Sequence, residues 1–223
     1  MEERTGIKSY VRRAGHISSA QQRAYTELSA QYALPFTQEA LNFAAVFGNS
    51  NPVIIEIGFG MGAATVRIAQ SNPSCNYLGI EVHKAGIGKL FLELEKHALH
   101  NVRCIEYDAV AALKSMIPDE GIAGFHIFFP DPWQKKRHHK RRLVTRPFTD
   151  LVAAKLQAGG YVYMVTDWLD YAWWAYRELS ATPYLCNAFE GFAPAQEWRP
   201  RTRFEERALA LNHEIRELYF LKH

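Results

Sequence analysis

The sequence predicts an α/β protein built on a mostly parallel β-sheet with helices on both faces. Five apolar runs are continuous rather than alternating, a pattern typical of strands buried on both faces of a parallel sheet. Helix-like stretches separate these runs, which indicates βαβ units. A length of 223 residues, with 48% hydrophobic and 22% charged residues, suits one soluble globular domain.

The elements can be placed along the chain from their apolar patterns. The expected strands are Val53–Ile57, Tyr77–Glu81, Val102–Glu106, Phe125–Phe129 and Tyr161–Thr166. The expected helices are Ala63–Gln70, Lys84–His97, Pro147–Leu156 and Trp168–Leu179. The tail differs, because Tyr184–Phe189 and Ile215–Leu221 are strand-like and Phe204–Leu211 between them is helical. A last strand reached through such a connection can return antiparallel beside its predecessor.

Composition excludes several classes of protein. No apolar run approaches the ~20 residues that a membrane-spanning helix needs, and Met1–Gly15 lacks the apolar core of a secretory signal. Cys75, Cys104 and Cys186 are scattered and show no CxxC spacing, which argues against a disulfide framework and against a zinc site. We therefore expect a cytoplasmic protein without a metal site.

Positive charge is concentrated in one segment, although the net charge is only +3. Residues 135–142 contain six Lys or Arg, two His and no acid. A polyanionic partner that binds one face would explain this concentration, whereas a solvated surface is the alternative. We divide the chain into a polar N-terminal appendage, residues 1–31, and a domain, residues 32–223. The appendage is expected to be partly disordered and to contact the same partner.

A nucleoside site is expected at the carboxyl ends of the strands, where open α/β sheets bind ligands. Gly58, Gly60 and Gly62 follow the first strand, and glycines there permit positive φ and close approach of a ligand to the backbone. Glu81 ends the second strand, where a carboxylate can accept both ribose hydroxyls. Asp108 follows the third strand, within reach of an adenine edge. The alternative is a tight structural turn with surface acids.

The kind of nucleoside depends on Glu56. The pattern Gly58-x-Gly60-x-x-Ala63 also satisfies the loose dinucleotide motif, so that NAD stays open. Glu56, two residues before Gly58, would repel a pyrophosphate but suits the ammonium group of a methionine moiety. This charge argument favours S-adenosylmethionine (SAM) as the cofactor.

A second candidate site follows the fourth strand. Residues 128–133 form a proline-stiffened turn with the carboxylate of Asp131 and the large ring of Trp133. The ring can stack on an extruded base whose polar atoms meet the acid, whereas the alternative is a structural turn with a core tryptophan. The basic run follows directly, so contiguous residues would hold both the target base and the phosphates of a nucleic acid.

Two further segments carry candidate side chains. Asp167 ends the fifth strand and offers another carboxylate. Arg199–Glu205 contains bases, a turn and a helix start, and a helix N-terminus with a dipole-favoured acid explains it equally well. The histidines show no metal-ligand spacing, so none is assigned to a metal.

Three motifs stand out in the sequence: Glu56-Ile-Gly-Phe-Gly-Met-Gly62, Pro130-Asp-Pro-Trp-Gln-Lys-Lys-Arg-His-His-Lys-Arg-Arg142 and Thr202-Arg-Phe-Glu205. Together they resemble the bacterial tRNA (guanine-N7-)-methyltransferase family. Arg12-Arg13-Ala14-Gly15 and Ala20-Gln21 are similar to that family too, so the resemblance covers nearly the whole chain. The glycine loop is shared with many methyltransferases, whereas the Asp-Pro-Trp turn with its basic extension is far more specific.

The resemblance implies a class I, Rossmann-like, SAM-dependent methyltransferase fold, with a seven-stranded, mostly parallel sheet whose last strand is antiparallel. The SAM-binding residues that it implies are Glu56, Gly58, Gly60, Gly62, Glu81, Asp108 and Asp131. The substrate-binding residues that it implies are Lys135, Asp167, Thr202, Arg203, Phe204 and Glu205. The RNA-contacting residues that it implies are Arg137, His138, His139, Lys140, Arg141 and Arg142.

The implied reaction is methylation of N7 of a guanosine in the tRNA variable loop, the position known as G46. The resemblance implies tRNA as the partner, no obligate protein partner, and either a monomer or a homodimer. Guanine N7 has an in-plane lone pair, so attack on the methyl group needs no deprotonation and in-line positioning dominates. Attack makes the purine cationic. Asp131 is the expected catalytic residue, because a nearby carboxylate would stabilise that charge and orient the base.

Three alternatives stay open. A methyltransferase for an exocyclic base amine uses an Asp-Pro-Pro-aromatic turn, but here Trp133 stands where that turn has its second proline. An NAD-dependent oxidoreductase would leave the basic run unused. A catalytically inactive RNA-binding module would not need the acids at the strand ends.

Overall fold

The computed structural model describes residues 8–11 and 16–223. All five expected parallel strands are present: β2 (Val53–Ile57), β3 (Asn76–Glu81), β4 (Val102–Glu106), β5 (Ile122–Phe128) and β6 (Leu156–Thr166). They pair in parallel in the spatial order β4-β3-β2-β5-β6. Every residue of β2 and β3 is buried, which explains the continuous apolar pattern, because both faces of the sheet are covered.

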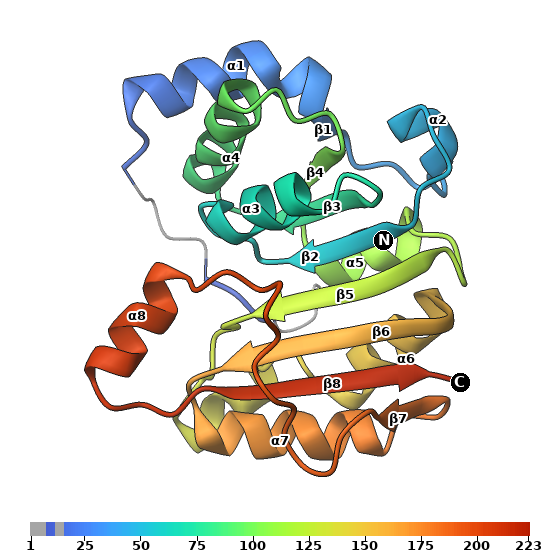
Figure 1. Ribbon diagram of the computed structural model, residues 1–223, viewed down its shortest axis with the longest axis vertical. Coiled ribbons are helices and arrows are strands. Elements are labelled where there is room, and N and C mark those ends of the chain that lie inside the picture. The colour runs from blue at the N-terminus through green and yellow to red at the C-terminus, as the bar shows by residue number, and fades with distance from the viewer. Residues whose placement is uncertain (1–7, 12–15) are drawn as a thin grey trace, which may run out of the picture.

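Three more strands complete the sheet in the part of the chain that the structure describes. They are β1 (Ala33–Leu34), β7 (Leu185–Asn187) and β8 (Arg216–Lys222). β8 lies between β6 and β7 and is antiparallel to both, so the expected antiparallel last strand is confirmed (Figure 1). The described sheet has eight strands rather than the expected seven, because the two residues of β1 pair with the outer edge of β4.

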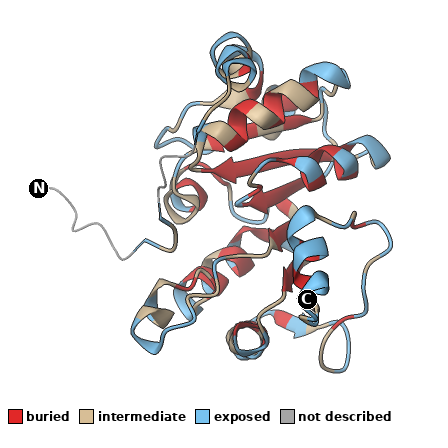
Figure 2. Ribbon diagram, turned by 90° about the vertical axis from the view of Figure 1, so that its left-hand side faces the viewer, coloured by how far each residue is buried: buried red, intermediate tan, exposed pale blue. Residues whose placement is uncertain are grey.

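Helices cover both faces of the sheet. The first face carries α1 (Ser19–Tyr32), α3 (Ala63–Ser71) and α4 (Lys84–Lys96). The second carries α2 (Phe43–Phe47), α5 (Ala109–Ser115), α6 (Arg146–Lys155) and α7 (Leu169–Ser180). In Figure 2 the strands are buried and the outer sides of the helices are exposed. The apolar pattern does not predict α2 and α5, because elements of five and seven residues are too short to show a helical period.

One half of the first face has no helix of its own. The connection from β7 to α8 (Arg203–Ala210) crosses in front of β8, β6 and β5 instead (Figure 1). Aromatic side chains fill this region: His126 stacks on Phe128 and on Trp198, and Tyr161 stacks on Tyr219. A loop, rather than a helix, therefore covers this half of the sheet.

Helix α1 belongs to the folded domain, although its polar composition does not predict it. A capping box starts the helix, in which Ser18 accepts from the backbone N–H of Gln21, and the side chain of Gln21 accepts from that of Ser18. Ala24 is fully buried against α4. Arg12–Gly15 of the expected appendage lies outside the described residues. No helix within residues 8–11 and 16–223 has the length and apolar character needed to cross a membrane.

The contact between α1 and α4 depends on Gly88. A Cβ atom at this position would lie 2.4 Å from the carbonyl oxygen of Gln21, which belongs to backbone and cannot rotate away. We expect Gly88→Ala to reduce the free energy of unfolding by about 1–3 kcal/mol through this clash, even though alanine favours helices over glycine. Urea unfolding measures the effect, with Lys96→Ala at the exposed end of α4 as the control. A variant as stable as wild type would contradict this close packing.

Candidate active site

The candidate residues lie at one edge of the sheet. Because β4, β3, β2, β5 and β6 are parallel neighbours, their carboxyl ends share that edge. Along it, in spatial order, follow Asp108, Glu81, the 58–62 loop, Asp131 and Asp167. The carboxylates that are far apart in the sequence are thereby gathered where open α/β sheets bind ligands.

The glycine loop is fastened to the end of β3 by Glu81. Gly58, Gly60 and Gly62 have φ values of 73°, 57° and 72°, which glycine adopts without strain. The backbone N–H of Gly60 donates to Oε2 of Glu81 at 2.9 Å, and Val82 donates to its Oε1 at 2.6 Å. The buried Glu81 carboxylate is therefore held at a fixed place beside the loop.

Glu56 lies beneath the same loop, at the end of β2. Its carboxylate is buried and accepts a hydrogen bond from the hydroxyl of Thr65 at 2.8 Å. Burial raises the pKa of Glu56 to about 7, opposed by the Thr65 hydrogen bond and reinforced by the negative charge of Glu81. A ligand ammonium group at this place would favour the ionised carboxylate.

A further acid on this side of the edge is Asp108. Its side chain accepts from the backbone N–H of Ala111 at 2.9 Å and caps α5, which fixes its position after β4. Above the loop there is open space, since a Cβ atom at Gly58 or Gly60 would have no neighbour within 4 Å. A cradle with open space and three fixed carboxylates fits a nucleoside that carries an ammonium group, as SAM does.

The turn after β5 has a strained backbone on both sides of Asp131. Phe129 and Trp133 have φ values of 50° and 46°, a region that residues other than glycine rarely adopt. Such strain persists only where the surrounding structure enforces it, and it occurs often at functional sites. The turn presents Asp131 as an exposed carboxylate.

Trp133 is engaged with other parts of the chain. The guanidinium of Arg141 lies 3.9 Å from the centre of its ring, and the indole N–H donates to the carbonyl of Ser9 at 3.0 Å. Arg141 also donates to the carbonyls of Lys8 and Tyr10. One face of the ring is thus covered, so stacking of a base on that face is not available in this conformation.

The basic run forms a 3-10 helix, η1 (Lys136–Arg141). Four cationic side chains of the basic run are exposed to solvent: Lys135, Lys136, Arg137 and Lys140. His138 and His139 are half-buried. A cluster of exposed cations therefore follows directly on the Asp131 turn.

Arg142, predicted to contact RNA, is buried in this structure, unlike most of the basic run. Arg142 is 2% exposed, donates to the carbonyl of Pro132 at 2.9 Å and pairs with Asp170. Its guanidinium also lies 5.1 Å from the ring centres of Tyr171 and Trp174. The side chain points into the domain because these partners replace its water, and it fixes the turn to α7.

Some of the residues predicted to bind substrate are exposed, and one is buried. Asp167 is partly exposed and lies 3.3 Å from the ring of His213, beside a cavity of about 550 Å³. Thr202 caps α8, and Arg203 and Phe204 are exposed. Glu205, by contrast, is buried, and both of its carboxylate oxygens accept from Arg199, so it does not face the edge.

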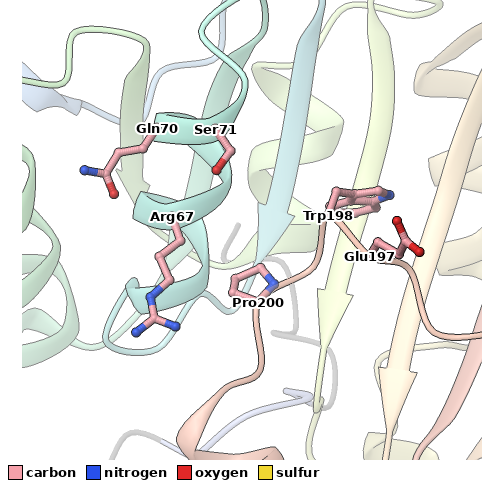
Figure 3. Close-up of a pocket in the computed structure, with 6 residues that line it drawn as sticks. All are labelled: Arg67, Gln70, Ser71, Glu197, Trp198 and Pro200. Carbon is pink, nitrogen blue, oxygen red and sulfur yellow. The ribbon is translucent and has the colours of Figure 1, made fainter.

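A groove of about 340 Å³ lies between α3 and the segment that precedes α8 (Figure 3). The residues that line it are Arg67, Gln70, Ser71, Glu197, Trp198 and Pro200. In Figure 3, Trp198 lies in front of β5, and Pro200 lies at the carboxyl end of β2. The groove therefore leads toward the glycine loop.

The sequence does not reveal the structural roles of three residues at this site: Arg142, Arg199 and Trp198. Arg142 is contiguous with the basic run, so the sequence alone does not separate it from the exposed cations. The partners of Arg199 are a glutamate six residues away and residues of two strands. No local pattern reveals such pairs. Within residues 8–11 and 16–223, no group of three or more His, Cys, Asp or Glu side chains could hold a metal ion.

Comparison with known proteins relates this geometry to a family. Residues 50–218 match the family model described as putative methyltransferase. The tRNA (guanine-N(7)-)-methyltransferase of Dechloromonas aromatica is 45% identical over 97% of this chain and 88% of that protein. The protein of the same name from Nitrosospira multiformis is 46% identical over 97% of this chain and 94% of its own length.

A solved structure supports the fold. The 16S rRNA methyltransferase KamB has a TM-score of 0.57, covers 95% of this chain and 97% of its own, and is 15% identical. At this identity the similarity concerns the fold alone.

The buried carboxylate of Glu56 makes stability depend on pH. Burial raises the pKa of Glu56 in the folded state to about 7. The contribution of this group to the free energy of unfolding is therefore fully present below the unfolded pKa of about 4.3, and it is lost as pH rises through 7. Glu56→Gln should therefore stabilise the protein by up to roughly 3 kcal/mol at pH 8 and change little at pH 4.5. Urea unfolding at both pH values measures this difference, and an equal effect at both would contradict it.

Arg142 and Lys140 lie in the same basic run but should respond differently to mutation. Arg142→Ala removes a buried side chain with four partners, so we expect a loss of about 2 kcal/mol in the free energy of unfolding. Lys140→Ala removes an exposed side chain and should stay within about 0.5 kcal/mol of wild type. Thermal denaturation of both variants measures this, and equal stabilities would show that Arg142 is not structural.

Proposed function

The chain belongs to the tRNA (guanine-N7-)-methyltransferase family, and from this premise we propose that it methylates N7 of a guanosine in tRNA with SAM as donor, at G46 of the variable loop. The observation that carries the proposal is the edge of the sheet, where three fixed carboxylates adjoin an exposed Asp131 and a cluster of exposed cations. The similarity to a curated tRNA (guanine-N(7)-)-methyltransferase, 45% identical over 97% of this chain, supports the same proposal.

Three acids would hold the methyl donor. Glu56 would pair with the ammonium group, Glu81 with the ribose hydroxyls and Asp108 with the adenine edge. The glycines let the donor approach the backbone, and Gly60 already fixes Glu81 beside the loop. Bound SAM supplies an electrophilic methyl group on its sulfonium. Residues of this chain then have to position the acceptor in line with that group.

Asp131 is the proposed catalytic residue. The N7 lone pair lies in the plane of the guanine and needs no base to free it, so catalysis depends on orientation and on charge. Because attack makes the purine cationic, the exposed carboxylate of Asp131 would stabilise that charge as it develops. Arg142 holds the carbonyl of the adjacent Pro132, which keeps the turn in place.

RNA binding would use the exposed cations around η1. Lys135, Lys136, Arg137 and Lys140 are exposed and could bind phosphates, and Arg203 and Phe204 are exposed at the start of α8. Residues 8–10, which Arg141 and Trp133 hold beside the turn, would add contacts from the N-terminal appendage. We place the enzyme in the cytoplasm, where tRNA is found, as a monomer or a homodimer without an obligate partner.

The reaction is tested with labelled SAM and unmodified tRNA, followed by digestion and mapping of the modified nucleotide. We expect 7-methylguanosine at position 46. An N6-methyl product would instead identify an exocyclic-amine methyltransferase, and stabilisation of the protein by NAD rather than SAM would favour an oxidoreductase.

Asp131→Asn keeps the shape of the side chain and removes its charge. We expect kcat to fall by about 10²-fold or more, since electrostatic stabilisation of the transition state is lost, with tRNA affinity nearly unchanged. Single-turnover methylation and filter binding measure the two quantities. A variant that methylates at the wild-type rate would exclude this role.

Arg137→Ala combined with Lys140→Ala tests the RNA path. Loss of two phosphate contacts should weaken tRNA binding and reduce the slope of log K against log salt by about 2. The control is Lys96→Ala combined with Lys114→Ala, which removes two exposed cations from other parts of the surface. If both double variants have the wild-type slope, the RNA follows another path.

A further inference from the structure

A second buried charge cluster lies outside the donor site and unites three segments of the chain. Arg199 donates to both oxygens of Glu205, at 2.5 and 3.0 Å, and to Glu217 at 2.8 Å. Its Nε donates to the hydroxyl of Tyr163 at 3.0 Å, and that hydroxyl donates to Glu217. The side chains of Arg199, Glu205 and Glu217 are between 3% and 6% exposed.

Such a cluster is costly to bury and does not persist by chance. One guanidinium is shared by two buried carboxylates, so removal of Arg199 would leave both carboxylates without their counter-charge. Charge-assisted, forked hydrogen bonds fix direction as well as distance, because the guanidinium donors are rigid and planar. The arrangement therefore specifies one geometry for the segments that contribute to it.

The cluster fastens the loop that covers the sheet. Tyr163 belongs to β6 and Glu217 to β8, whereas Arg199 and Glu205 belong to the connection and to α8. The same connection is also joined to the sheet at Ala193, which pairs with Glu217. Beside Arg199, the ring of Trp198 lies 5.2 Å from that of Tyr163. Arg199 is thus the last fixed point before the chain reaches the edge of the sheet.

Residues 202–204 lie in the chain between Arg199 and Glu205, the two members of the cluster that the connection and α8 contribute. Thr202 accepts from the backbone N–H of Glu205 at 3.2 Å, and Phe204 is 68% exposed. Because Arg199 holds Glu205 and Glu205 is bound to Thr202, the direction in which Arg203 and Phe204 point depends on the buried cluster.

We infer that Arg199, Glu217 and Tyr163 are positioning residues that hold the Thr202–Phe204 segment against the substrate, and that Glu205 acts through Arg199 rather than on the RNA. This inference rests on the proposed function for its kinetic part only. Glu217 is the decisive residue, since it lies in the sheet at 4% exposure and cannot touch a substrate.

The test compares Glu205→Gln, Glu217→Gln and the double variant, with Glu206→Gln as the matched control. Glu206 is an exposed acid in the same first turn of α8. Each of the two buried substitutions should raise KM for tRNA about fivefold or more, with Kd for SAM within about twofold of wild type. The double variant should be no worse than the more damaging single one, because both act on the same guanidinium. Glu206→Gln should match wild type.

Three kinetic outcomes would overturn the inference. A defect in Glu205→Gln with a normal Glu217→Gln would place Glu205 on the substrate itself. Additive defects in the double variant would mean that the two acids act separately. Lower thermal stability of both variants with unchanged KM would show a purely structural cluster.

Hydrogen exchange gives a readout that needs no activity. Backbone amides of residues 202–211 should exchange faster in Glu217→Gln than in wild type, and at the wild-type rate in Glu206→Gln. Unchanged exchange in Glu217→Gln would refute the positioning role. A wild-type protein that produces no 7-methylguanosine, while this exchange difference is seen, would refute the proposed function and leave the cluster's hold on α8 established.

Discussion

The hydrogen bond from the backbone of Gly60 to the carboxylate of Glu81 joins the two loops on which the donor site depends. β2 and β3 are parallel neighbours, so the glycine loop and the end of β3 lie side by side. A single buried carboxylate can then accept from both. Gly86 allows α4 to pass close to the loop, since a Cβ atom there would overlap the carbonyl of Gly60. The geometry of the loop is therefore set by its neighbours as much as by its own glycines.

Charge is divided along the edge of the sheet. Glu56, Glu81 and Asp108 lie on the side of β2, β3 and β4, where they suit a donor that carries positive charge. The cations of η1 lie after β5, where they suit phosphates. Asp131 stands between the two groups. A cationic donor and an anionic RNA would each find the opposite charge on its own side, with the methyl acceptor at the boundary.

Two arginines, Arg142 and Arg199, join segments of the folded chain through buried hydrogen bonds. Arg142 joins the Asp131 turn to α7, and Arg199 joins the covering loop to β6 and β8. Both segments approach the acceptor side of the edge, and neither is a regular strand. Rigid, forked guanidinium bonds replace there the ladder of backbone hydrogen bonds that fixes the strands. The acceptor side is thus held by side chains, and the donor side by the sheet.

The sequence by itself determined the parallel sheet, the order of its main elements and the position of each acid after a strand. Those features follow from local patterns: continuous apolar runs, helical periods and glycines beside a strand end. The sequence could not determine α1, whose stability comes from packing on α4, or the short helices α2 and α5. Nor could it show which cations are exposed and which are buried. Lys140 and Arg142 are two residues apart in one basic run, yet one is exposed and the other is buried among Pro132, Asp170 and two rings. Only the tertiary structure decides this, because the burial of a charge depends on partners that the fold brings from distant parts of the chain.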